Sequence, residues 1–83
     1  MPYFVYMLKS EKKSKIKTYV GYTNNLKRRL ALHNDGLGAK STRGRTWKVI
    51  YTEKYLTKKE AISREYYIKK NRKIRNQIKD KFK

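Results

Sequence analysis

The sequence has no cysteine, a single histidine and only six acidic residues among its 83 positions. Without cysteine, a disulfide scaffold, a disulfide-linked partner and a thiolate metal site are all excluded. One histidine excludes a zinc site built from several histidines. No apolar run approaches the roughly 18 residues of a membrane-spanning helix, and no basic segment precedes the apolar stretch of MPYFVYMLKS, so we expect no secretory signal. A cytoplasmic protein without membrane association is the expectation.

The acidic residues are outnumbered by 24 lysines and arginines, which leaves a net charge of +18. Such a charge predicts an anionic partner, with nucleic acid ahead of an anionic membrane or an acidic protein. The length fits a single domain over residues 1–83 with a small core. Large aliphatic side chains are few, but eight tyrosines and one tryptophan each bury about 150–250 Å². We therefore expect a folded domain whose core depends on tyrosine.

Aromatic and β-branched residues gather in three short runs, which predicts strands over residues 3–9, 18–23 and 47–55. The polar, lysine-rich residues 11–17 connect the first two runs, which are close enough to pair as a hairpin. Gly21 near the end of the second run indicates a close backbone approach or a bulge.

Apolar side chains recur at helical spacing in three further segments, which predicts helices over residues 26–34, 58–70 and 72–82. Thr23-Asn24-Asn25 supplies N-cap chemistry for the first helix, and Thr57 with Glu60 forms a capping box for the second. A glycine-bearing basic loop spans residues 36–46. The order β-β-α-β-α-α lacks the alternation of a doubly wound sheet, so it favours a small α/β sandwich of the α+β kind that contains antiparallel strands.

Several polar residues fall where a core is expected. Tyr6 and Tyr19 lie in the two strands of the hairpin, and pairing would bring them together. Arg29 and His33 are four residues apart and share a helix face. Glu65 lies on or beside an apolar helix face, where a carboxylate needs a partner or a metal. Taken singly, each has a commoner structural explanation: a core tyrosine, a core histidine, or a salt bridge to lysine.

The order and spacing of these five residues point to a function more specifically than any one of them does alone. The sequence resembles the GIY-YIG nuclease family in the order of its motifs. These are Phe4-Val5-Tyr6, then Tyr19-Val20-Gly21, then Arg29, His33 and a helical Glu65. The resemblance covers nearly the whole chain. The chain is similar to the small standalone bacterial branch of this family, in the segments YVGYTNNLKRRLALHN, GLGAKSTRGRTWKVIYTEKY and EAISREYYIKK. The chain departs from the first motif at Phe4 and Val5, which replace glycine and isoleucine. Val20 replaces isoleucine in the second motif.

The resemblance implies a three-stranded antiparallel sheet flanked by helices, with the active site on one face, and divalent-metal-dependent phosphodiester hydrolysis. By position, Tyr6 and Tyr19 match the motif tyrosines and Arg29 matches the invariant arginine. His33 matches a position that holds His or Tyr, and Glu65 matches the metal-binding glutamate. The family often has an asparagine after the glutamate near the scissile phosphate; Asn71 and Asn76 are both candidates, and Asn76 is preferred.

Elementary chemistry agrees with these roles. Mg²⁺, or Mn²⁺ in its place, is held by one or two carboxylates with water and substrate phosphate, so Glu65 alone suits a single-metal site. Arg29 offers a planar fork to a phosphoryl oxygen. We expect neighbouring cations to lower the pKa of one tyrosine from about 10, so that it helps to activate water. Either tyrosine fits, and His33 either deprotonates it or orients the phosphate.

The remaining positive charge predicts a phosphate-contacting surface whose affinity falls steeply with salt. Lys40, Arg43 and Arg45 in the glycine-bearing loop are the predicted contacts, together with Asn76. The prediction is a metal-dependent endonuclease acting on DNA, with a structure-specific enzyme of repair or recombination type as the narrower expectation. Two alternatives remain: a non-catalytic nucleic-acid-binding module on the same fold, and a ribosome- or membrane-associated protein that acts by charge alone. RNA as substrate and the oligomeric state are open.

Overall fold

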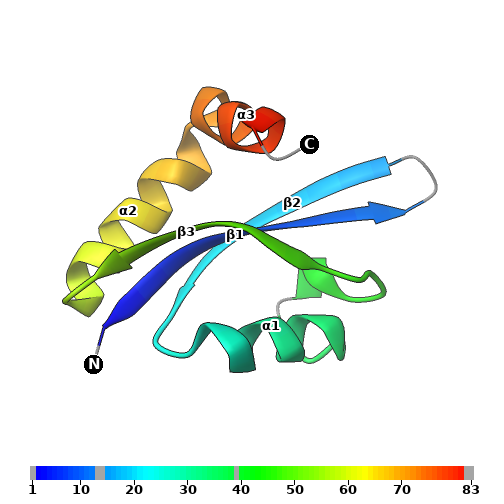
Figure 1. Ribbon diagram of the computed structural model, residues 1–83, viewed down its shortest axis with the longest axis horizontal. Coiled ribbons are helices and arrows are strands. Elements are labelled where there is room, and N and C mark those ends of the chain that lie inside the picture. Colours follow the sequence, from blue (N-terminus) through cyan, green and yellow to red (C-terminus); the bar gives the residue numbers. More distant parts are fainter. Residues whose placement is uncertain (1, 13–14, 39, 82–83) are drawn as a thin grey trace.

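Three antiparallel strands form a sheet in the order β2-β1-β3 (Figure 1). The computed structural model describes residues 2–12, 15–38 and 40–81. The strands are β1 (Tyr3–Lys12), β2 (Lys15–Thr23) and β3 (Lys48–Tyr55), and the helices are α1 (Leu26–Asn34), α2 (Lys58–Lys70) and α3 (Arg72–Lys81). A short 3-10 helix, η1 (Lys40–Thr42), lies in the loop before β3. The predicted fold and element order are confirmed.

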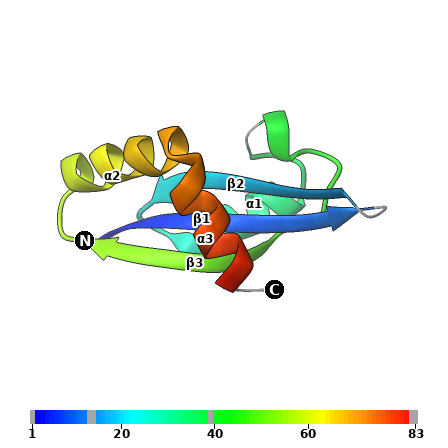
Figure 2. The same cartoon turned by 90° about the horizontal axis from the view of Figure 1, so that it is seen from above.

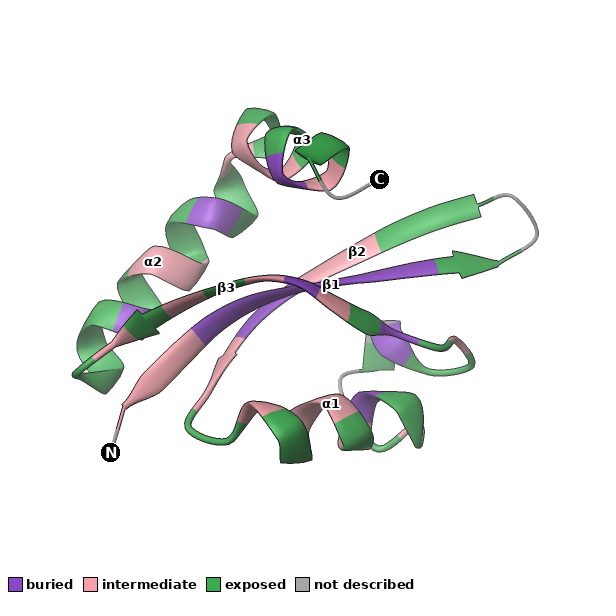
Figure 3. Cartoon of the chain, in the orientation of Figure 1, coloured by how far each residue is buried: buried purple, intermediate pink, exposed green. Residues whose placement is uncertain are grey.

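Helices cover both faces of the sheet, so the alternating side chains of β1 enter two separate cores. Val5 and Met7 pack with Ala61 and Ile68 of α2 and with Ile78 of α3. Tyr6 and Leu8 point to the other face, where Trp47 and residues of α1 surround them. In Figure 2, α3 crosses in front of the strands while α1 lies behind them. Figure 3 shows that the buried residues concentrate along β1.

The hairpin of β1 and β2 is longer than the sequence indicated. Most of the predicted connection, residues 11–17, is strand, and the register pairs Lys12 with Lys15. The side chains of this outer arm are exposed, so no apolar pattern marked it as strand. The ladder of backbone hydrogen bonds continues because it satisfies the main chain without burial. Residues 13, 14 and 39, and residue 82 at the end of the third predicted helix, lie outside the described residues.

The predicted helix starts are confirmed. Asn25 caps α1 by accepting a hydrogen bond from the backbone N–H of Arg28. Thr57 caps α2 by accepting from the N–H of Glu60, and its hydroxyl donates to the Glu60 carboxylate. None of the helices in the described ranges combines the length and apolarity that crossing a bilayer requires.

Candidate active site

Tyr6 and His33 meet on the α1 face of the sheet. Tyr6 comes from the central strand, and its hydroxyl lies 2.9 Å from His33 Nε2 on α1. The Tyr19 ring completes the group, with centroids 6.3 Å from Tyr6 and 4.8 Å from His33. The register pairs Tyr6 with Gly21 and Leu8 with Tyr19, so the two tyrosines are diagonal neighbours, as predicted. Tyr6 and His33 are both fully buried.

The other nitrogen of His33 is held by Thr42, at the end of η1. His33 Nδ1 lies 3.0 Å from Thr42 Oγ1. Thr42 is itself buried, and its backbone carbonyl accepts a hydrogen bond of 2.8 Å from the indole N–H of Trp47. The chain Tyr6–His33–Thr42 therefore fixes the imidazole at both ends. Thr42 was not among the predicted site residues, because a lone threonine in a polar loop carries no pattern of its own.

Two glycines leave the space that Tyr6 and His33 occupy. A Cβ on Gly21 would lie 2.6 Å from the Tyr6 hydroxyl oxygen, and a Cβ on Gly38 would lie 2.5 Å from His33 Nδ1. Both approaches are too short for nonbonded atoms. Of the two alternatives at Gly21, a close backbone approach or a bulge, the structure shows a close approach to the backbone, and the Tyr6 side chain makes it.

Arg29 stands beside the two tyrosines, on the same face of α1 as His33. Hydrogen bonding to Tyr6 raises the pKa of Arg29, so this guanidinium is permanently charged. Its Nε is buried and has no hydrogen-bond partner among the residues the structure describes. A buried donor of this kind needs an acceptor. A phosphate oxygen would supply one.

Burial decides the protonation states of the site. It raises the pKa of Tyr6 to about 12, although the Arg29 guanidinium acts in the opposite direction. For Tyr6, burial acts against the lowering that the sequence indicated, because desolvation of the phenolate outweighs the adjacent Arg29 guanidinium. Burial, reinforced by Arg29, lowers the pKa of His33. The resting site consequently holds a neutral phenol and a neutral imidazole.

Glu65 lies on α2, the helix that packs against the opposite face of the sheet. Its side chain is 16% exposed and forms an ion pair with Lys69, one turn along α2, with 3.1 Å between Glu65 Oε1 and Lys69 Nζ. The Lys69 ammonium also lies 5.7 Å from the centroid of the Tyr19 ring, so α2 meets the tyrosine pair here. The Glu65 charge contributes to the raised pKa of Tyr6. The structure thus brings Glu65 into electrostatic range of Tyr6. It also gives Glu65 the lysine partner that a structural role would require.

A divalent cation has one carboxylate available at this position. Within the described ranges, no three His, Cys, Asp or Glu side chains gather as a ligand set. Glu65 alone, with water and a substrate phosphate, matches the way Mg²⁺ is commonly bound. The donor chemistry therefore fits a single hard cation, which would displace Lys69.

The predicted nucleic-acid contacts fall into two groups. Lys40 and Arg43 are exposed. Arg45 instead bonds to the outer arm of the hairpin, at 3.2 Å to Ser10 Oγ and 2.9 Å to the Lys15 carbonyl. Its guanidinium ties the loop to the sheet, which the charge pattern alone did not reveal.

The two candidate asparagines differ in a similar way. Asn71 lies between α2 and α3, where its side chain accepts from the N–H of Ile74 at 3.1 Å. This bond caps α3. Asn76 is exposed on α3. The structure does not bring either asparagine into the Tyr6–His33 group.

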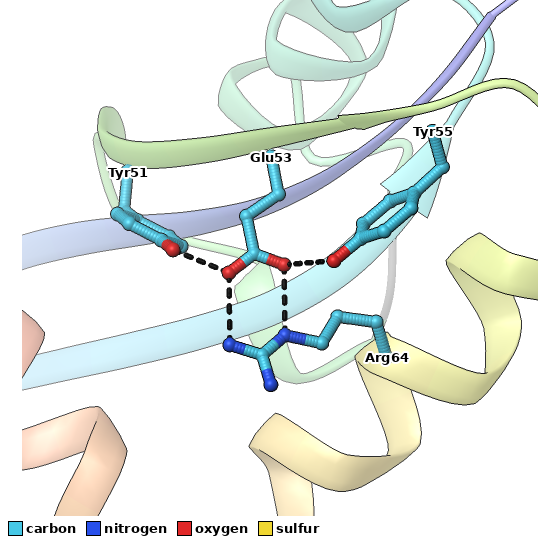
Figure 4. Close-up of polar contacts among 4 residues, drawn as sticks. All are labelled: Tyr51, Glu53, Tyr55 and Arg64. Carbon is cyan, nitrogen blue, oxygen red and sulfur yellow. Dashed lines mark hydrogen bonds and ion pairs between the residues drawn. The ribbon is translucent and has the colours of Figure 1, made fainter.

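A second polar network lies on the α2 face of the sheet (Figure 4). The Glu53 carboxylate on β3 accepts hydrogen bonds from Tyr51 and Tyr55 and an ion pair of 2.8 Å from Arg64 on α2. Burial alone would raise the pKa of Glu53, but these bonds outweigh it and hold the pKa below its ordinary value. Since Arg64 directly precedes Glu65, the network positions the helix turn that carries the metal-ligand candidate.

Comparison with known proteins identifies the family of the chain. The sequence profile described as the GIY-YIG catalytic domain matches residues 2–79. The chain therefore belongs to the GIY-YIG catalytic-domain family, and the resemblance drawn from the motifs is confirmed.

Several similar proteins are UPF0213 proteins, which form a small standalone family of this type. A UPF0213 protein of Clostridium perfringens is 53% identical over 68 residues, 81% of this chain and 70% of that protein. One of Oceanobacillus iheyensis is 47% identical, over 81% of this chain and 76% of that protein. The solution NMR structure of the UPF0213 protein BH0048 of Bacillus halodurans matches with a TM-score of 0.52 and 35% identity, over 96% of this chain and 84% of that one.

Proposed function

We propose that this protein is a metal-dependent endonuclease that hydrolyses DNA phosphodiester bonds, with substrates chosen by structure, as in repair or recombination. The observation that carries the proposal is the buried series of hydrogen bonds from Tyr6 through His33 to Thr42, beside Arg29. Burying polar side chains costs free energy, and titratable groups with perturbed pKa values, such as Tyr6 and His33, gather at functional sites. Membership of a nuclease-type family supports the same chemistry.

The donors around His33 favour one tautomer of its ring in this proposal. Arg29 can only donate, so the Tyr6 oxygen is its acceptor. The Tyr6 O–H then donates to His33 Nε2, and the His33 proton lies on Nδ1 and is donated to Thr42 Oγ1. This assignment leaves Nε2 unprotonated and facing the Tyr6 hydroxyl.

A proton path follows from this tautomer. Water attacks the phosphorus and gives a proton to the Tyr6 oxygen, while the Tyr6 proton moves to His33 Nε2. The bond from phosphorus to the leaving oxygen breaks, and the leaving alkoxide takes a proton from solvent water. Tyr6 is assigned this role in preference to Tyr19 because it is the tyrosine hydrogen-bonded to His33. Arg29 binds a nonbridging phosphoryl oxygen, which supplies the acceptor that its buried Nε lacks.

Glu65 is the residue that would hold Mg²⁺ or Mn²⁺. When bound, such an ion stabilises negative charge on the phosphate and on the leaving oxygen. Lys69 neutralises Glu65 in the absence of the ion and remains near Tyr19 as a second cation.

The test is cleavage of plasmid, flap and single-stranded DNA in Mg²⁺ or Mn²⁺ by the wild type and Arg29→Ala. The matched control is Arg28→Ala, which removes the neighbouring, exposed arginine of the same helix. We expect cleavage to fall by a factor of about 100 or more in Arg29→Ala and to persist in Arg28→Ala. Equal activity in the two variants would contradict the proposal.

The same assay separates the alternatives. A non-catalytic binding module would retain DNA without cutting it in any metal. A protein acting by charge alone would be insensitive to Tyr19→Phe, which keeps the charge and removes one hydroxyl from the site.

A further inference from the structure

The outer face of α2 gathers exposed apolar side chains that the active site does not use. Among the described residues, four of the six exposed large hydrophobic side chains lie in one segment: Leu56, Ile62, Tyr66 and Tyr67. Tyr66 is 62% exposed and Tyr67 is 48% exposed. Exposed aromatic rings are uncommon on a surface without a partner, since each forfeits a large burial area.

The rings are set among cations. Lys70 lies 5.5 Å from the Tyr66 centroid, and the Arg64 guanidinium lies 5.1 Å from the Tyr67 centroid. Lys58, Lys59 and Lys70 have no salt bridge within the described part of the chain, whereas the Glu65 and Glu53 carboxylates are each paired. The one other carboxylate of the helix, Glu60, accepts a hydrogen bond from Thr57.

A hollow of about 530 Å³ adjoins this face, lined by Tyr55, Lys59, Glu60, Ser63, Arg64 and Tyr67. Its wall combines two tyrosine rings with two cationic side chains, Lys59 and Arg64, and one carboxylate, Glu60. Successive residues of a helix are about 100° apart around its axis. The side chains of Tyr66 and Tyr67 therefore lie at successive angles around α2 between Glu65 and this hollow. Figure 2 shows α2 running along the outside of the molecule.

We propose that the outer face of α2, defined by Ile62, Tyr66, Tyr67, Lys59 and Lys70, binds an unpaired strand of the nucleic acid, with bases stacked on Tyr66 and Tyr67. Flat aromatic rings beside lysines are the chemistry that single strands recognise, because every base offers a π face and every phosphate a negative charge. The inference rests on the proposed function for nucleic acid as the ligand. It adds the substrate class: DNA with a single-stranded segment next to the cleavage site.

The test measures binding without cleavage, in EDTA, by anisotropy of labelled oligothymidylate and of a duplex of equal length. We expect the double variant Tyr66→Ala/Tyr67→Ala to weaken single-strand binding about tenfold or more, and duplex binding by less than about twofold. Tyr66→Phe/Tyr67→Phe keeps both rings and should match the wild type. The matched control is Leu37→Ala, which removes an apolar side chain that is 71% exposed after α1 and should change neither affinity.

The Tyr66→Leu/Tyr67→Leu variant distinguishes stacking from apolar contact. If it binds oligothymidylate as tightly as the wild type, the stacking proposal is wrong and the face is a generic apolar surface, such as a protein partner would use. Equal losses for single strand and duplex would also overturn it. If the wild type binds both DNA forms and no tyrosine variant changes either affinity, only this inference fails; if the wild type binds neither form, the proposed function fails with it.

A direct readout uses Tyr66→Trp. Stacking of a base on the indole should quench its emission when unlabelled oligothymidylate is added. The wild type supplies the background, because its single tryptophan, Trp47, is buried. Unchanged emission at a saturating concentration would contradict stacking at this position.

Discussion

The hydroxyl of Tyr6 lies 2.9 Å from Nε2 of His33, and both side chains are buried in the core between the sheet and α1. This hydrogen bond joins the strand that centres the sheet to the helix that carries Arg29. It makes the candidate active site part of the core. Changes to the site are therefore expected to alter both chemistry and stability, and the experiments below separate the two.

The first prediction concerns protonation of His33. Burial, with Arg29 nearby, lowers its pKa, so the unfolded chain takes up a proton at higher pH than the folded protein. The stability that neutral His33 contributes is therefore complete above about pH 6.5, and declines as the pH falls towards the lowered folded value. The NMR titration of the ring protons measures this directly, since the chain has one histidine. A midpoint at or above the ordinary value would contradict the account.

The second prediction concerns Thr42 as a positioning residue. Thr42→Val keeps the shape of the side chain and removes the oxygen next to His33 Nδ1. It leaves a buried donor without its partner, at a cost of about 1–3 kcal/mol in the free energy of unfolding. Cleavage should slow, and the pH dependence of the rate should shift, because the His33 tautomer is no longer fixed. Thr42→Ser should restore both; a rate and pH profile unchanged in Thr42→Val would remove Thr42 from the site.

The third prediction concerns the Glu53 network, which holds α2 on β3. Glu53→Gln weakens the bond to Arg64 and should lower the free energy of unfolding by about 1–3 kcal/mol. Because Arg64 precedes Glu65, the cleavage rate should fall while DNA affinity in EDTA is preserved. Glu60→Gln, an exposed change on α2 outside this network, is the control. Identical cleavage rates in the two variants would show that the network does not position Glu65.

The pH dependence of this network has a definite sign. The pKa of Glu53 is held below its ordinary value, so the folded protein keeps the carboxylate charged where the unfolded chain protonates it. Its stabilisation is present above about pH 4.3 and is lost as the pH falls through the folded value. In Glu53→Gln, chemical denaturation should show a shallower decline of stability in acid than in the wild type.

The fourth prediction separates two arginines of the same loop. Arg43 is exposed, and Arg43→Ala should reduce the slope of log affinity against log salt for duplex DNA by about 0.9, the contribution of one phosphate contact. Arg45→Ala removes bonds to Ser10 and Lys15, so it should lower the melting temperature. The reverse assignment, with Arg43 structural and Arg45 governing the salt slope, would contradict the structure.

The fold could be predicted from the sequence because its signals are local. Strand runs, helical spacing and the caps at Asn25 and Thr57 each depend on residues a few positions apart. The order of Tyr6, Tyr19, Arg29, His33 and Glu65 then indicated the family. The outer arm of the hairpin could not be predicted, because backbone pairing and contacts such as Lys12 to the Gly44 carbonyl extend it without an apolar pattern.

The missed parts of the site depend on distances between segments. Thr42 is significant only because η1 places it against His33. Glu53 and Arg64 are eleven positions apart on a strand and a helix, among many other possible charge pairs. The pKa of Tyr6 depends on whether burial or Arg29 has the larger effect, and composition indicated only the cations.

The central claim, that Glu65 serves phosphodiester hydrolysis at the Tyr6–His33 site, is tested most directly by single-turnover cleavage with protein in excess over DNA. The wild type is compared with Glu65→Gln in Mg²⁺, and with Glu60→Gln as the matched control on α2. The account predicts that Glu65→Gln binds DNA as the wild type does but cleaves it at least about 100-fold more slowly. Cleavage by Glu65→Gln at the wild-type rate would contradict it.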